Sequence, residues 1–155
     1  LDTKQFTMRT GSRTFEAAAF LRRSGADTGD VKKLFQNDLE GTIAKYDIIQ
    51  TARMYKEGIA VARVDHTVGR ITAAQASDEL LNISGIDTSF VLFPDNEGWV
   101  ILSARSMGDV NVQVVLEKLG GGGNAATAGA QVPGKTVDEV EKLLYQAIDQ
   151  YLEDE

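Results

Sequence analysis

The chain contains no cysteine, one histidine and only two prolines among its 155 residues. Without cysteine it can form neither a disulfide nor a thiolate metal site, and it has no cysteine nucleophile. A single histidine excludes a metal centre built from several imidazoles of this chain. We interpret His66 as a residue at a strand end, because nothing around it resembles the nucleophile elbow of a serine hydrolase. The lack of disulfides suits a cytosolic compartment.

Long apolar runs are also missing. A membrane-spanning helix needs roughly 20 consecutive apolar residues, and no run in this sequence approaches that length. Residues 1–30 carry charges throughout and lack the apolar segment of a signal peptide. Because the chain opens on Leu1 rather than on methionine, we expect it to be an excised piece of a longer protein.

Basic residues are the minority among the charged ones. The 16 lysines and arginines face 23 acidic residues, which gives a net charge of −7. The chain therefore lacks the basic face on which binding to duplex nucleic acid depends. A small anionic ligand held by one or two arginines is compatible with this charge. The remaining composition, 43% hydrophobic and 25% charged, is typical of one or two small globular domains.

The first third of the chain is predicted to be mainly helical. Residues 1–13 are polar and are expected to form a loop or a strand end. Apolar side chains then recur every three or four positions, which predicts helices over residues 14–24, 27–35 and about 39–55.

From about residue 54 the pattern changes to alternating strands and helices. Residues 58–65 are rich in alanine and valine with partial alternation, which predicts a strand. Residues 72–75 read as a capping box that starts a helix. We expect that helix to bury Ala76, Leu80 and Ile83.

A β-hairpin and two further helices complete the predicted unit. Two apolar runs, 89–93 and 99–104, flank a spacer with strong turn residues, so they predict the hairpin. Asp109 is expected to cap the next helix, and a short strand is predicted at 128–132. Thr136 and a glutamate three residues later form a capping box for the last helix. The predicted fold class is α/β with a mostly mixed sheet and flanking helices.

Four consecutive glycines, Gly120 to Gly123, are the first candidate for function. Glycines let backbone N–H groups converge on an anion without Cβ clashes, so the run could cradle a phosphate. It is neither a Walker A loop nor a dinucleotide fingerprint. The alternative is a helix C-cap, for which one glycine suffices.

Three further features carry charge that could serve binding. Arg105, in Ser103–Ser106, follows a predicted strand and could clamp a phosphate, although a lone arginine is more often a surface residue. Asp2 could bind a divalent cation, or be a surface aspartate. Arg9 and Arg13 could line an anionic cleft, or belong to an exposed basic loop.

Two long runs together carry a family resemblance. The first comprises LDTKQF, RTGSRTFEAA, LR and GADT within residues 1–28, and the second is SARSMGDVNVQ leading into LGGGG, at 103–123. Together they resemble the C-terminal half of the bacterial membrane-bound cyclic-di-AMP phosphodiesterases of the DHH phosphoesterase superfamily. The resemblance implies that residues 1–53 are the helical tail of a DHH domain. Residues 54–155 would be a DHH-associated, substrate-binding domain.

The resemblance also implies a chemistry. These enzymes hydrolyse cyclic-di-AMP to 5′-pApA with two Mn²⁺ ions in the DHH domain, and Asp2, followed by a threonine, is similar to their last metal ligand. Asn124 departs from the family, most members of which have a histidine after the glycines; asparagine can still hydrogen-bond a base or phosphate but carries no charge. The residues that the resemblance implies in substrate binding are Ser103, Arg105, Ser106, Asn111, Gly121, Gly122, Gly123 and Asn124.

One metal ligand cannot build two metal sites, so we expect this chain alone to be inactive as a phosphodiesterase. It would be the cytoplasmic-facing part of a membrane-anchored bacterial protein that acts in second-messenger signalling. It would contact a cyclic dinucleotide or a short linear one, and neither duplex nucleic acid nor the membrane; a homodimer is compatible with the family. Two alternatives remain: a DHH-family phosphatase or exonuclease on short linear oligonucleotides, or a non-catalytic nucleotide-binding or dimerisation module.

Overall fold

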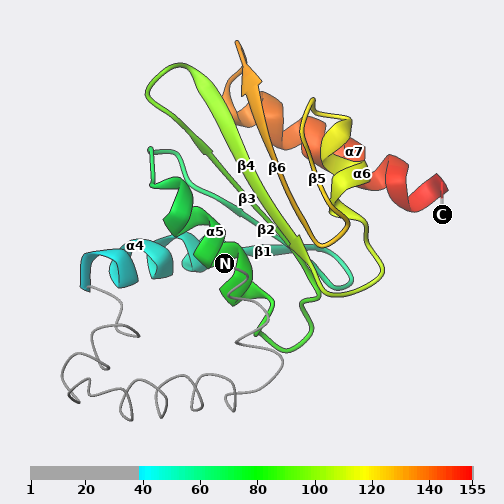
Figure 1. Cartoon of the computed structure of the whole chain (residues 1–155), viewed down its shortest axis with the longest axis horizontal. Helices are drawn as coiled ribbons and strands as arrows, with labels where there is room; N and C mark the ends of the chain where they lie inside the picture. Colours follow the sequence, from blue (N-terminus) through cyan, green and yellow to red (C-terminus); the bar gives the residue numbers. More distant parts are fainter. Residues whose placement is uncertain (1–38, 155) are drawn as a thin grey trace, which may run out of the picture. The chain divides into compact units, whose positions relative to one another are not determined.

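The structure, a computed structural model, describes residues 39–154 (Figure 1). The helices predicted at 14–24 and 27–35, and the candidates Asp2, Arg9 and Arg13, lie outside the described residues. The elements, in chain order, are α4 (Leu39–Gln50), β1 (Arg53–Lys56), β2 (Ile59–Arg63), α5 (Arg70–Leu80), β3 (Thr88–Pro94), β4 (Trp99–Ser106), α6 (Val112–Glu117), β5 (Gly122–Gly123), β6 (Thr127–Pro133) and α7 (Val137–Asp154).

The six strands form one mixed sheet, as predicted, in the order β1-β2-β3-β4-β6-β5. Strands β2 and β3 are parallel and every other neighbouring pair is antiparallel. The parallel pair needs a long crossover connection, and α5 supplies it. Strands β3 and β4 form the hairpin that the turn residues predicted.

Both faces of the central strands are buried. In β3 the first six of seven residues are buried, as expected for a strand covered on both sides. Phe90 and Leu92 pack with residues of α6 and α7, whereas Val91 and Phe93 pack with residues of α5 and with Ile48 of α4. The sheet thus separates two apolar layers, and α6 and α7 lie on the opposite side of the sheet from α5 (Figure 1).

The α5 side of the sheet is covered only in part. Helix α5 contacts β3 and β4, while β6 and β5 continue the sheet past β4. On β6, the residues that alternate with the buried Ala128, Ala130 and Val132 include the exposed Thr127 and Gln131. The partial cover leaves a polar, exposed surface of the sheet beside α5.

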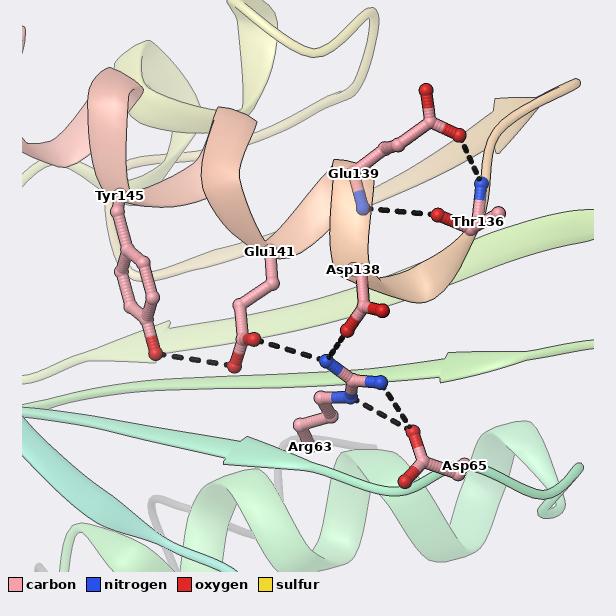
Figure 2. Close-up of polar contacts among 7 residues, drawn as sticks. All are labelled: Arg63, Asp65, Thr136, Asp138, Glu139, Glu141 and Tyr145. Carbon is pink, nitrogen blue, oxygen red and sulfur yellow. Dashed lines mark hydrogen bonds and ion pairs between the residues drawn. The ribbon is translucent and has the colours of Figure 1, made fainter.

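A charged cluster ties β2 to the start of α7 (Figure 2). Arg63 donates from Nε to Asp65 Oδ1 at 2.8 Å and from Nη1 to Glu141 Oε1 at 3.1 Å. It also donates to Asp138, and that hydrogen bond is the main reason why its pKa is raised. Tyr145 donates to the other oxygen of Glu141 at 3.2 Å. Because the arginine comes from β2 and two of its carboxylate partners come from α7, the cluster fixes where α7 meets the sheet.

The last helix begins as the sequence predicted. Thr136 Oγ1 accepts from the Glu139 N–H at 3.1 Å, and Glu139 Oε1 accepts from the Thr136 N–H at 3.0 Å (Figure 2). The bond from the Thr136 N–H is the main reason why the pKa of the Glu139 carboxyl is lowered. The predicted stripe is buried at Val140, Leu144, Ala147, Ile148 and Tyr151.

Two predicted helix starts are wrong. Helix α5 starts at Arg70 with Gly69 as its N-cap and no side-chain capping bond, so residues 72–75 lie inside the helix and form no capping box. Helix α6 is capped by Asn111 rather than by Asp109, because the Asn111 Oδ1 accepts from two backbone N–H groups of the first turn.

Other predicted boundaries shift. Ile83, expected in the core, is 45% exposed because α5 ends before it. The helix expected to reach about residue 55 ends at Gln50, and β1 follows. The boundary placed at residues 53 and 54 stays a prediction; the second compact unit of the chain comprises residues 43–155.

Candidate functional site

Arg105 is held on the partly covered side of the sheet. It alternates along β4 with the buried Ala104 and Ser106, so its side chain shares a face with Ser103. Its Nε donates to Asp78 Oδ1 of α5 at 3.0 Å, and its Nη1 donates to the Ala104 carbonyl at 2.9 Å. A longer bond of 3.3 Å joins Nη1 to the Ser103 hydroxyl. Three polar contacts, to two side chains and one backbone carbonyl, therefore fix the orientation of the guanidinium.

A pocket of about 320 Å³ opens beside Arg105, and we call it the first lobe. One wall is α5, the floor is β4 and β6, and the far rim is β5. A pocket of this size is at the lower end of the range for small-molecule sites. Its lining residues are Arg70, Ala73, Phe93, Ile101, Leu102, Ser103, Arg105, Gly122, Gly123, Thr127, Ala128 and Gly129.

The glycine run serves first as a helix end. The Gly120 N–H donates to Glu117 at 3.1 Å and the Gly121 N–H donates to Leu116 at 2.8 Å, the two bonds of a Schellman motif. Gly120 takes the positive φ, +83°, that this motif places after the helix. The alternative interpretation, in which the glycine run is a helix C-cap, is therefore confirmed for Gly120 and Gly121.

Gly122 and Gly123 form the edge strand β5, and Gly121 directly precedes it. A Cβ on Gly121 would lie 2.3 Å from the Gly129 carbonyl oxygen, and one on Gly123 would lie 2.3 Å from that of Thr127. These two positions are glycine because β5 lies so close to β6. Gly122 differs: a Cβ there meets nothing within 4 Å, and the residue lines the first lobe. Among these three, Gly122 alone has no packing reason to be glycine.

A second pocket of about 360 Å³ adjoins the first, and we call it the second lobe. Four residues line both lobes: Arg70, Ile101, Leu102 and Gly129. We call the two lobes together the trough. The second lobe is lined by Arg70, Ile101, Leu102, Gly120, Gly121, Gly129, Ala130 and Gln131.

The trough contains residues that the sequence did not single out. Arg70 and Gln131 are both exposed and polar. They lie 61 positions apart in sequence (131 minus 70), and the packing of α5 beside the sheet brings them to one surface. No local motif marks either of them.

Residues 56–154 match the family of the DHHA1 domain. The chain belongs to the DHHA1 domain family. The match covers the sheet from the end of β1 and all of α7. It confirms the DHH-associated domain that the motif runs implied.

Curated relatives of this DHHA1 domain are cyclic-di-AMP phosphodiesterases. GdpP of Geobacillus thermodenitrificans is 46% identical over 155 residues, which are 99% of this chain and 24% of that protein. PdeA of Listeria monocytogenes is 42% identical over 97% of this chain and 23% of its own length. GdpP of Bacillus subtilis is 41% identical over 99% of this chain and 24% of its length. The chain thus spans about a quarter of these relatives.

Solved structures share the DHHA1 fold. An exopolyphosphatase-related protein from Bacteroides fragilis superposes with a TM-score of 0.71 at 20% identity, over 90% of this chain and 43% of that one. The pGpG-specific phosphodiesterase PggH from Vibrio cholerae gives a TM-score of 0.56 at 17% identity, over 92% and 52% of the two chains. At these identities the likeness concerns the fold alone.

Three of the predicted site residues lie elsewhere in the DHHA1 domain. Ser106 is buried on the other face of β4, where its hydroxyl accepts from the Gly108 N–H at 3.3 Å. Asn111 caps α6. The Asn124 Oδ1 accepts from the N–H groups of Ala126 and Thr127, both at 2.9 Å, and so closes the turn between β5 and β6. None of the three lines either lobe.

No helix of the DHHA1 domain's described residues is both long and apolar enough to cross a membrane. Likewise, residues 39–154 bring together no group of three or more histidine or acidic side chains able to hold a metal ion. The described residues therefore do not fit the Mn²⁺ ions that the resemblance implies, and Asp2 lies outside them.

Proposed function

We propose that this domain is the substrate-binding part of a cyclic-di-AMP phosphodiesterase, and that the dinucleotide lies in the trough. The observation that carries the proposal is the placement of Arg105, which is oriented by Asp78 and Ser103 and lines a pocket rimmed by glycines. The close relatives that act on cyclic-di-AMP by name share 41% to 46% of their residues with this chain. The product 5′-pApA would occupy the same surface.

The chemistry of the first lobe suits a phosphate next to a flat base. The Nη2 group of Arg105 has no hydrogen bond to any described residue, so the guanidinium can still donate to a phosphate oxygen. The lobe also has apolar lining residues, which include Ala73, Phe93 and Ile101, as is typical of small-molecule sites. Gly122 and Gly123 allow the ligand to approach the β5 backbone closely.

We derive no hydrolytic step from these residues. The Mn²⁺ ions that such enzymes use would be held outside the described part of the chain. What the trough supplies is positioning: charge for the phosphate and an apolar wall for the base. We also propose that the chain alone does not hydrolyse cyclic-di-AMP.

A calorimetric titration tests the binding proposal. Cyclic-di-AMP and 5′-pApA are titrated separately into the 155-residue chain and into Arg105→Lys, which keeps the charge but loses the planar fork. We expect the wild type to bind both ligands and the variant to bind at least about tenfold more weakly, as for the loss of one charge-assisted hydrogen bond. Circular dichroism confirms that the variant is folded. Absence of binding to the folded wild type would overturn the proposal.

A further inference from the structure

Arg70 stands at the boundary of the two lobes. It is the first residue of α5, it is exposed, and it is one of only four residues that line both pockets. The other three shared residues are apolar or glycine. Among the described residues that line the trough, two are therefore cationic: Arg105 inside the first lobe and Arg70 between the lobes.

The two arginines differ in their pairing. Arg105 is paired with Asp78, and the side chains of the pair are 14% and 19% exposed. The side chain of Arg70 makes no hydrogen bond or ion pair with any residue that the structure describes. The positive charge of Arg105 is thus largely balanced by its own partner, whereas no residue among 39–154 balances that of Arg70. An anion in the trough would gain most of its long-range attraction from Arg70.

The lobes have room for more than one nucleotide half. Their volumes are about 320 and 360 Å³, and each has its own polar side chains, Ser103 in the first and Gln131 in the second. A dinucleotide has two nucleosides joined through phosphate. Laid along the trough, it would place a phosphate near the boundary between the lobes, where Arg70 stands.

We infer that Arg70 is a substrate-binding residue that pairs with a phosphate of the dinucleotide where it passes from the first lobe to the second. The inference rests on the proposed function. Arg105, which is held by its hydrogen bonds to the protein, would orient one end of the ligand, and Arg70 would attract it with a charge that no described residue compensates. In a chain with a net charge of −7, such a local charge decides whether an anion binds.

The test compares two arginines that carry the same charge in different places. Arg70→Gln removes the charge from the trough. Arg53→Gln removes one charge from the exposed edge strand β1, whose Arg53 lines neither lobe. The affinity of each full chain for cyclic-di-AMP is measured by calorimetry at low and at high salt, together with wild type and Arg70→Lys.

We expect Arg70→Gln to weaken binding about tenfold or more, the loss of one charge-assisted pairing, and Arg53→Gln to change it less than twofold. Arg70→Lys should restore part of the affinity, and the salt dependence should be shallower in Arg70→Gln than in wild type. If wild type binds and Arg70→Gln binds equally well, the inference about Arg70 is overturned while the proposed function stands. If folded wild type does not bind at all, the proposed function itself fails. Equal losses in Arg70→Gln and Arg53→Gln would also overturn the inference, since they would show an effect of net charge alone.

Discussion

Asp78 and Arg105 come from different layers of the fold and meet through a 3.0 Å hydrogen bond from Arg105 Nε to Asp78 Oδ1. Helix α5 contributes the carboxylate and β4 contributes the guanidinium, so the pair joins the helix to the sheet at the edge of the first lobe. Together with the Ala104 carbonyl and the Ser103 hydroxyl, Asp78 fixes the orientation of the guanidinium. The pair therefore has a structural consequence and a functional one, and these can be separated by experiment.

The structural consequence is an energetic coupling between the two side chains. In a double-mutant cycle of Asp78→Asn and Arg105→Met, we expect a coupling free energy of about 1–2 kcal/mol, as for a charge-assisted bond between partly buried groups. Urea unfolding of the four proteins measures it. Strictly additive losses would mean that the two residues contribute independently.

The glycine run offers a contrast between neighbouring positions. Gly122→Val should change the free energy of unfolding by no more than about 0.5 kcal/mol, because its Cβ meets open space, yet its side chain would fill the rim of the first lobe. We expect it to weaken cyclic-di-AMP binding at least about tenfold, or 1.4 kcal/mol. Gly121→Val is the matched control: it drives a Cβ into the Gly129 carbonyl and should destabilise the fold by about 2–3 kcal/mol.

The opposite outcome for Gly122 would be informative. If Gly122→Val unfolds the domain while Gly121→Val does not, Gly122 is needed for folding, although a Cβ there would meet open space. Loss of helicity in Gly122→Val would point the same way.

The Arg63 cluster should matter for stability and not for binding. Arg63→Met keeps the apolar stem but removes the bonds to Asp138 and Glu141. We expect the free energy of unfolding to fall by about 1–2 kcal/mol, since the cluster is partly exposed. Affinity for cyclic-di-AMP should be unchanged, because Arg63 lines neither lobe. If Arg63→Met is as stable as wild type, the bonds between Arg63 and these carboxylates make no net contribution to the free energy of unfolding.

Alkaline pH should weaken the contact between β1 and α7. Burial, followed by the hydrogen bond to Asp149 and the charge of that carboxylate, raises the pKa of Tyr55 from 10.0 to about 12. The folded chain thus holds this proton more tightly than the unfolded chain does. The resulting stability is present below pH 10 and is lost as the pH rises toward 12.

Comparison with Tyr55→Phe isolates this titration. The free energy of unfolding of both proteins is measured in urea at pH 9 and pH 11. Lysine deprotonation affects both proteins alike, so the difference between their pH-dependent losses reports the titration of Tyr55. We expect wild type to lose more stability than the variant between the two values. Equal losses of stability in the two proteins would mean that Tyr55 has the same pKa in the folded and in the unfolded chain.

Much of the fold follows from local pattern. The hairpin of β3 and β4 was predicted because turn residues separate two apolar runs, and α7 because Thr136 and Glu139 cap an apolar stripe. Helix α5 was misplaced at its start because Gly69 caps it without a side chain. Strands β1 and β5 were missed, since one is short and exposed and the other is two glycines that become a strand only against β6.

The site was predictable where its residues lie in motif segments. Ser103, Arg105 and Gly121 to Gly123 do line the trough. Asn111 and Asn124 share those segments but are occupied by capping and turn bonds, which residue type alone does not reveal. Arg70 lay outside the motifs, because the packing of α5 beside β4 brings it to the trough.

Backbone NMR most directly tests the claim that the dinucleotide lies in the trough. In a titration of the isotope-labelled chain with cyclic-di-AMP, we expect the amides of Gly122, Gly123 and Gly129 to shift. The amides of Gly98 and Gly134, which line neither lobe, should stay in place. Saturable shifts confined to Gly98, Gly134 or other residues outside the trough, or no shifts at all, would contradict the account.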